Sequence, residues 1–186
     1  MPVLIEPSLV AATPATLPPL VLVLGGARSG KSRFAESLIE GAGLPALYLA
    51  SAQAEDDEMR ARIAAHRARR DVGLLTAEEP LELTNRLLAE IAGARPILID
   101  CLTLWLSNLL LAGRDIGFET ERLLAALPQV KTPVIMVANE VGLGIVPDNA
   151  LGRSFRDHAG RLNQRIAAAA DRVIFMAAGL PLALKG

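Results

Sequence analysis

The stretch Leu20-Val21-Leu22-Val23-Leu24-Gly25-Gly26-Ala27-Arg28-Ser29-Gly30-Lys31-Ser32 decides the fold of this 186-residue chain. Its first five residues form a continuous apolar run, which is typical of a strand buried on both faces. The next eight follow the pattern G-x-x-x-x-G-K-S, and the residues Ser32–Glu40 have a helical period. A strand, a glycine-rich loop and a helix in this order form a phosphate-binding loop, because backbone N–H groups and the helix N-terminus face the phosphate oxygens.

Two side chains of this loop have predicted roles with a bound nucleotide. Lys31 is expected to reach the β- and γ-phosphates, and the Ser32 hydroxyl is expected to ligate Mg²⁺. The alternative is a glycine-rich turn without function, which the complete motif between a strand and a helix disfavours. We therefore predict that nucleotide contacts come from Gly25, Gly26, Ala27, Arg28, Ser29, Gly30, Lys31 and Ser32.

Apolar runs and helical segments alternate along the rest of the chain. Further strands are predicted at Ala46–Ala50, Pro96–Asp100, Val134–Ala138 and Val173–Ala177. Helices are predicted at Ser32–Glu40, Asp57–Arg70, Pro80–Ile91, Leu102–Ala112, Glu119–Leu127 and Asn149–Ala170. The alternation predicts an α/β fold of the P-loop NTPase type, with a mostly parallel sheet flanked by helices.

Composition places this fold in one domain and excludes several classes of function. Residues 1–19 hold five of the twelve prolines, so we expect a flexible Pro-rich extension before a single domain at residues 20–186. A net charge of −1 argues against nucleic-acid binding through bulk positive charge. The single cysteine, Cys101, and two histidines leave no Cys- or His-based metal cluster. Since no apolar run approaches about 20 residues and no basic leader precedes one, we expect a cytoplasmic protein without a membrane partner.

A carboxylate at the end of a neighbouring strand is the expected second Mg²⁺ ligand. Asp100 follows the apolar run Ile97–Ile99, as in the Walker B pattern. The alternative is that Asp100 caps the helix that begins near Leu102. Asn139 and Glu140 follow the strand Val134–Ala138, and Glu140 is either a base or hydroxyl-orienting group or part of a structural loop.

His66 lies among five arginines in the segment Arg60–Arg70. Neighbouring cations disfavour imidazolium, and a neutral imidazole can accept a nucleotidyl group as a phosphoramidate. The alternative is a solvated histidine on a helix whose charges only suit its dipole. His158, beside Asp157, is expected to be an ordinary surface histidine.

Several motifs together resemble the bifunctional adenosylcobinamide kinase/adenosylcobinamide-phosphate guanylyltransferase family of cobalamin biosynthesis. The resemblance runs from Leu20 to Lys185. The phosphate loop is shared by many NTPases, so two other segments are more specific. These are Asn139-Glu140-Val141-Gly142-Leu143-Gly144-Ile145-Val146-Pro147 and Ala159-Gly160-Arg161-Leu162-Asn163-Gln164.

The resemblance implies two successive reactions. A nucleoside triphosphate, ATP or GTP, phosphorylates the terminal hydroxyl of adenosylcobinamide; GTP then guanylylates His66, and GMP passes to the new phosphate to give adenosyl-GDP-cobinamide. Beyond the phosphate loop, the family's nucleotide contacts fall on Ala50, Ser51, Ala52, Arg67, Ala68, Arg69, Arg70, Glu78 and Asp100. The family is also associated with a homotrimer. Two other functions stay open at this point: a single-activity P-loop kinase of a small molecule, and a non-catalytic nucleotide-binding module.

Overall fold

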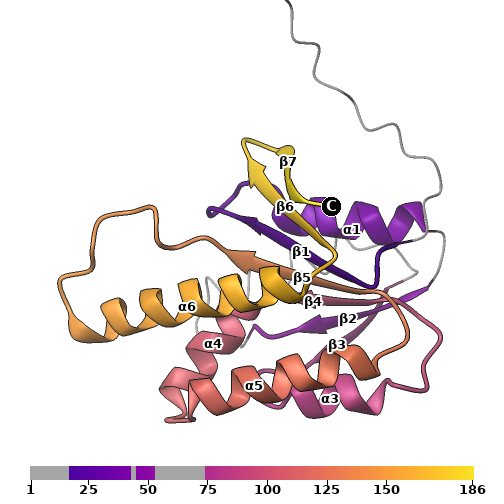
Figure 1. Ribbon diagram of the computed structural model, residues 1–186, viewed down its shortest axis with the longest axis horizontal. Helices are drawn as coiled ribbons and strands as arrows, with labels where there is room; N and C mark the ends of the chain where they lie inside the picture. The colour runs from indigo at the N-terminus through magenta and orange to yellow at the C-terminus, as the bar shows by residue number, and fades with distance from the viewer. Residues whose placement is uncertain (1–16, 43–44, 53–73) are drawn as a thin grey trace, which may run out of the picture.

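The strands of this chain form one sheet with the order β3-β2-β4-β5-β1-β6-β7. The computed structural model describes residues 17–42, 45–52 and 74–186 (Figure 1). Every neighbouring pair is parallel except β6 and β7, which are antiparallel. The strands are β1 (Leu20–Gly25), β2 (Ala46–Ala50), β3 (Leu74–Glu78), β4 (Ile97–Asp100), β5 (Val134–Asn139), β6 (Arg172–Ala177) and β7 (Leu180–Lys185). The predicted α/β fold with a mostly parallel sheet is confirmed.

Helices cover both faces of the sheet, and their apolar sides form two cores (Figure 1). Among the described residues, one face packs against α1, and the other packs against the remaining α-helices. The helices are α1 (Lys31–Gly41), α3 (Leu83–Ala89), α4 (Leu102–Leu111), α5 (Ile116–Ala126) and α6 (Ala150–Ala169), with a short 3-10 helix η1 (Leu127–Gln129). We call the side of the sheet that packs against α1 the α1 face.

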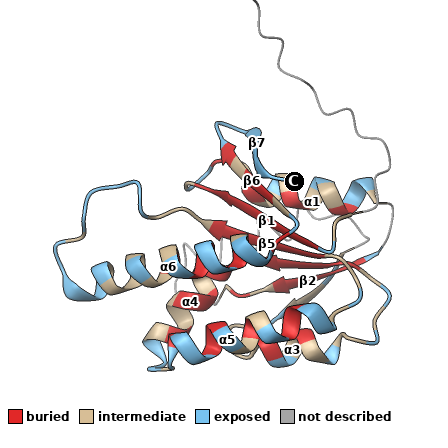
Figure 2. Ribbon diagram, in the orientation of Figure 1, coloured by how far each residue is buried: buried red, intermediate tan, exposed pale blue. Residues whose placement is uncertain are grey.

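The continuous apolar runs of the central strands follow from these two cores. In β1, Leu20, Leu22 and Leu24 enter one core, whereas Val21 and Val23 enter the other. Successive side chains of a strand point to opposite faces, so a strand covered on both sides needs an apolar residue at every position. Figure 2 shows this as buried strands in the middle of the molecule and an exposed β7 at its edge.

The ends of several helices differ from the prediction because side chains of the flanking residues fix them. α5 begins at Ile116 rather than at Glu119, since Asp115 caps it by accepting a hydrogen bond of 2.9 Å from the Phe118 N–H. Pro80 lies outside α3, because Glu79 Oε1 accepts from the N–H groups of Leu81 and Glu82 and holds a turn there.

Two strands, β3 and β7, were absent from the prediction. β3 is only partly buried and all six residues of β7 are exposed, so neither carries the apolar run of a strand buried on both faces. The helix predicted at Asp57–Arg70 lies outside the described residues. In the part of the chain that is described, no helix combines the length and apolar character that crossing a bilayer requires.

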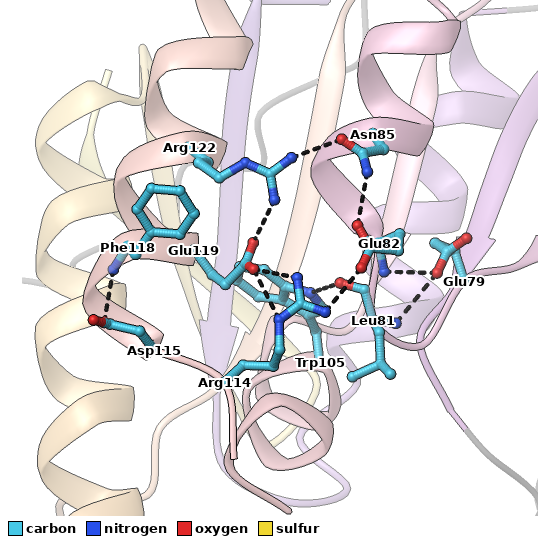
Figure 3. A network of polar contacts seen from close by, with 10 residues as sticks. All are labelled: Glu79, Leu81, Glu82, Asn85, Trp105, Arg114, Asp115, Phe118, Glu119 and Arg122. Carbon is cyan, nitrogen blue, oxygen red and sulfur yellow. Dashed lines mark hydrogen bonds and ion pairs between the residues drawn. The ribbon is translucent and has the colours of Figure 1, made fainter. Parts of the chain in front are cut away.

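An ion-pair network joins α3 to α5 on the side of the sheet away from α1 (Figure 3). Glu119 is 3% exposed. Its Oε1 accepts from Nε and Nη2 of Arg114, and its Oε2 accepts from Arg122 Nη1 at 2.9 Å. Arg114 also donates to Glu82, and Trp105 donates from Nε1 to the Leu81 carbonyl at 3.0 Å. The network therefore ties the helices that cover this core to one another.

Glu119→Ala is expected to lower the free energy of unfolding by about 1 to 2 kcal/mol, because it removes the buried carboxylate that accepts hydrogen bonds from the half-buried side chains of Arg114 and Arg122. Glu121→Ala is the matched control on the same helix. It removes the exposed pair of Glu121 with Arg165 and is expected to change stability little. Urea unfolding of both variants measures the difference, and an equal effect of the two substitutions would contradict the role given to Glu119.

Candidate active site

The phosphate loop joins the end of β1 to the start of α1, as predicted. Gly30 stands before the helix with φ +97°, and Arg28 has φ +57°. Left-handed residues of this kind turn backbone N–H groups into a concave anion site. At Gly25 (φ +152°), an added Cβ would lie 2.5 Å from the Met176 carbonyl oxygen and 2.7 Å from Ser29 Oγ. Only glycine therefore fits at the first position of the loop.

The hairpin of β6 and β7 supports this loop from the side. Its turn residues, Ala178 (φ +52°) and Gly179 (φ +82°), both have positive φ, as a two-residue hairpin turn requires. The Gly179 N–H donates to the Ser29 carbonyl at 3.0 Å. An added Cβ at Gly30 would come within 3.4 Å of Gly179 Cα. The strand missing from the prediction thus contributes to the shape of the loop.

Lys31 lies inside the loop and not on the surface. Its side chain is buried, and Nζ donates to the Gly26 carbonyl at 2.6 Å. Burial lowers the pKa of Lys31, while the Cys101 thiol and the Asp100 carboxylate act in the opposite direction. Lys31 and Asp100 therefore interact electrostatically, which agrees with the roles predicted for them in phosphate and metal binding.

Three predicted site residues form a row at the carboxyl end of the sheet. Ala50 ends β2, and its register partners are Glu78 in β3 and Asp100 in β4. Partners in register point to the same face, so the two carboxylates flank β2 on one side of the sheet. Leu98 and Tyr48 belong to the core beneath α1, which places this row on the α1 face with the phosphate loop.

Asp100 is held by the Tyr48 hydroxyl, which donates to its Oδ2 at 2.8 Å. Tyr48 is 2% exposed. The residue that caps α4 is Cys101, with no side-chain cap hydrogen bond, so the alternative of Asp100 as a helix cap is wrong. Burial, and secondarily the Asp100 charge, raise the pKa of Cys101 to about 12. The thiol therefore stays protonated and is no candidate nucleophile.

Ser51 and Asn108 fix the turn that carries Asp100. Ser51 is 1% exposed, and its Oγ donates to the Cys101 carbonyl at 2.7 Å and accepts from the Cys101 N–H at 2.9 Å. Asn108 Nδ2 donates to the carbonyls of Ser51 (2.8 Å) and Pro80 (3.0 Å). Both hydrogen bonds of the Ser51 hydroxyl are therefore made within the protein. Ala52, the next residue, is the last described residue before position 74.

The oxygen ligands proposed for Mg²⁺, Ser32 and Asp100, suit a hard cation. Asp100 Oδ2 is bonded to Tyr48, and among the described residues its Oδ1 has no hydrogen-bond partner. Within that same part of the chain, no group of three or more His, Cys, Asp or Glu side chains is placed to hold a metal. Mg²⁺ at a nucleotide needs only one or two protein ligands besides phosphates and waters, so this pair fits the ion.

The Glu140 carboxylate accepts a hydrogen bond from within its own turn. Its Oε1 accepts from the Gly142 N–H at 2.5 Å, and its backbone N–H donates to the Gly25 carbonyl at 3.0 Å. These contacts favour the structural-loop alternative.

The two histidines differ in what the structure describes. The described residues do not include His66, nor the predicted nucleotide contacts Arg67, Ala68, Arg69 and Arg70. His158 is half-buried on α6.

Three residues near the loop escaped prediction as functional. Tyr48 is the only tyrosine of the chain. Its alternation with Ala46 and Ala50 along the predicted strand was the available signal, because residues two apart in a strand share a face. Thr103 and Asn163 are buried polar residues that both bond to the backbone of Asn139. No periodicity marks the last two, because their partner is distant in the sequence.

Solved structures resemble the fold at low sequence identity. The flagellar accessory protein FlaH from Methanocaldococcus jannaschii has a TM-score of 0.54 and 16% identity, covering 92% of this chain and 80% of its own. The RadB recombinase has a TM-score of 0.53 and 14% identity, covering 87% and 76%. These likenesses show the P-loop NTPase type of fold alone.

Sequence relatives are much closer. The bifunctional adenosylcobalamin biosynthesis protein CobP of Pseudomonas aeruginosa is 52% identical over 167 residues, which cover 89% of this chain and 96% of the relative. The protein of the same description named CobU in Salmonella typhimurium is 44% identical over 181 residues, covering 89% and 99%. The family model described as cobinamide kinase / cobinamide phosphate guanyltransferase matches residues 21–184. The chain therefore belongs to the cobinamide kinase / cobinamide phosphate guanyltransferase family.

Proposed function

We propose that this chain phosphorylates adenosylcobinamide with a nucleoside triphosphate and then transfers GMP from GTP to the product, giving adenosyl-GDP-cobinamide. The observation that carries the proposal is the complete phosphate loop Gly25–Ser32, with Lys31 buried in it beside Asp100. Family membership supplies the substrate class, since a phosphate loop alone does not distinguish one acceptor from another.

In the kinase step, the terminal hydroxyl of adenosylcobinamide attacks the γ-phosphorus in line. The bond from Pγ to the β-phosphate oxygen breaks, the diphosphate leaves with the electron pair, and the hydroxyl proton passes to solvent. The loop N–H groups and the Lys31 ammonium bind the phosphates and stabilise the charge that moves toward the diphosphate. No protein nucleophile is needed for this step.

Ser32 and Asp100 are proposed to hold Mg²⁺, which supplies charge neutralisation at the β- and γ-phosphates when bound. Tyr48 orients the carboxylate by occupying its Oδ2, so that Oδ1 stays available. Ala50, Ser51, Ala52 and Glu78 are proposed to lie along the nucleotide, with Ser51 also fixing the Asp100 turn.

Asp100→Asn is expected to raise the Mg²⁺ concentration for half-maximal kinase activity, and Tyr48→Phe is expected to raise it about tenfold. The phenylalanine keeps the buried ring and removes only the hydrogen bond to the carboxylate. Magnesium titrations of the kinase rate give both values, with thermal unfolding to show that the fold persists. An unchanged Mg²⁺ dependence in Asp100→Asn would remove Asp100 from the metal site.

In the second reaction, an imidazole nitrogen of His66 attacks the α-phosphorus of GTP, and pyrophosphate leaves. The phosphate of adenosylcobinamide phosphate then attacks the same phosphorus, and the bond to the imidazole breaks, which restores the histidine. We propose that the arginines of the segment Arg60–Arg70 neutralise the triphosphate, among them Arg67, Arg69 and Arg70. Ala68, which lies between them in the sequence, is proposed as a further nucleotide contact.

We propose a homotrimer in the cytoplasm as the working form. Apolar side chains are exposed in two places that an assembly can cover: Leu143 and Ile145 after β5, and Leu180, Leu182 and Leu184 on the edge strand β7. Light scattering of the purified protein tests the assembly, which is expected to give three times the 19.7 kDa mass of the chain.

The experiment that tests the proposed kinase reaction gives the purified chain adenosylcobinamide and Mg²⁺ with either ATP or GTP. A phosphorylated corrinoid is expected by mass spectrometry with at least one donor. If neither donor yields it, while both nucleotides bind, the chain is a nucleotide-binding module and the proposal is wrong.

A further inference from the structure

We infer that the side-chain amide of Asn139 contacts the γ-phosphoryl group of the nucleotide in the kinase step; the inference rests on the proposed function. Asn139 is the last residue of β5, and the sheet order places β5 between β1, which carries the phosphate loop, and β4, which carries Asp100. Its register partner is Gly25, the first residue of the loop. Asn139 thus lies between the two strands that hold the phosphates and the metal.

The face to which Asn139 points follows from the strand itself. Ile135 and Val137 enter the core beneath α1, whereas Met136 and Ala138 enter the other core. The alternation puts Asn139 on the α1 face, together with Lys31 and Asp100. The register partner of Asp100 is Val137, so Asn139 is one position further along the same face. Its amide is therefore directed toward the space beyond the strand ends where ligands of parallel sheets bind.

The backbone of Asn139 is fixed while its side chain is left free. The Asn139 N–H donates to Thr103 Oγ1 at 2.6 Å, and its carbonyl accepts from Asn163 Nδ2 at 3.2 Å. Thr103 and Asn163 are both 7% exposed, so two buried polar side chains hold the backbone of Asn139 in place. Among the described residues, the side-chain amide of Asn139 has no hydrogen-bond partner. Buried anchors on the backbone and an unused amide are what a preorganised ligand contact requires.

A carboxamide suits the γ-phosphoryl group because it is neutral and carries two N–H donors. It can donate from Nδ2 to an equatorial oxygen of the phosphoryl group in transfer, and it neither gains nor loses a proton. The covalent changes remain those of the kinase step: the substrate hydroxyl bonds to Pγ and the diphosphate departs. Glu140, the neighbouring residue, has its carboxylate occupied by the Gly142 N–H, which leaves Asn139 as the polar side chain available at the end of this strand.

The test compares a non-hydrolysable β,γ-imido triphosphate with the corresponding diphosphate, both with Mg²⁺, by calorimetry. Asn139→Ala is expected to weaken triphosphate binding about tenfold and to leave diphosphate binding within twofold, because only the triphosphate offers the γ-group. The kinase kcat is expected to fall about a hundredfold. Asn139→Asp keeps the shape and both backbone hydrogen bonds, yet sets a negative charge against the γ-phosphate, so it should weaken triphosphate binding more than alanine does.

Asn85→Ala is the matched control, since Asn85 bonds to Glu82 and Arg122 on the other side of the sheet. It is expected to leave both affinities unchanged. Equal losses of triphosphate and diphosphate affinity in Asn139→Ala, or wild-type affinities and kcat in both Asn139 variants, would overturn the inference. A wild-type chain that binds no triphosphate would instead contradict the proposed function itself.

Discussion

Lys31→Ala is expected to lower kinase turnover by about a thousandfold while the fold persists. The ammonium is the charged donor of the phosphate loop, and it is held there by the Gly26 carbonyl, ready to meet the β- and γ-phosphates. Its loss removes stabilisation that is greatest in the transition state, where charge moves toward the leaving diphosphate. The measurement is the single-turnover rate of phosphate transfer to adenosylcobinamide, at saturating nucleotide.

Lys31→Met distinguishes the loss of kinase turnover from a loss of protein stability. Burial lowers the pKa of Lys31, so the folded state disfavours the charged form relative to the unfolded chain. That cost is fully present below the folded-state pKa and disappears as the pH rises through the unfolded value. Lys31→Met, which keeps much of the stem, should therefore melt at or above the wild-type temperature at pH 7 and still be inactive. Lys131→Ala, on the surface before β5, is the control for activity. An unchanged turnover in both Lys31 variants would remove this loop from the kinase site.

His66→Ala is expected to abolish attachment of GMP to the protein and the guanylyltransferase reaction. Only two histidines exist: His66 lies among five arginines in the segment Arg60–Arg70, whereas Arg156 beside His158 pairs with Asp157. The kinase reaction should continue, because its acceptor is the substrate hydroxyl and its phosphate loop is unchanged. The measurement is the intact mass of the protein after incubation with GTP and Mg²⁺, in parallel with separate assays of phosphate and GMP transfer.

His158→Ala is the matched control, since it removes the other histidine, which lies half-buried on α6. It is expected to retain the GMP adduct. An adduct that persists in His66→Ala and vanishes in His158→Ala would show that the nucleophile is His158 on α6. Equal loss of both activities in His66→Ala would indicate one nucleotide site, disturbed as a whole, for the two reactions.

The parts of the fold that could be predicted are those where local sequence and burial agree. The loop Gly25–Ser32 has a local pattern, and β1, β4 and β5 are apolar up to their last residue because both faces are covered. β7 could not be predicted, since its exposed residues carry no burial signal and its place depends on pairing with β6. Its turn at Gly179 nevertheless supports the phosphate loop.

The same distinction applies to the site. Lys31 and Asp100 follow strands in recognisable motifs, so their placement at one edge of the sheet follows from parallel topology. The hydrogen bond of Tyr48 to Asp100 spans 52 positions and that of Asn163 to Asn139 spans 24, and both exist only because of the register between strands and helices. Such partners are found from the structure, because no local pattern records which distant side chain a strand will meet.

One chain is proposed to perform both transfers in order, and the masses of the corrinoid products over time show whether it does. Adenosylcobinamide is incubated with the chain, Mg²⁺ and ATP until no further change occurs, and GTP is then added. Adenosylcobinamide phosphate is expected in the first period, and its conversion to adenosyl-GDP-cobinamide is expected after GTP is added. A phosphate product that forms but stays unconverted by GTP would show a single-activity kinase, and the absence of any phosphorylated corrinoid with ATP or with GTP would contradict both proposed activities.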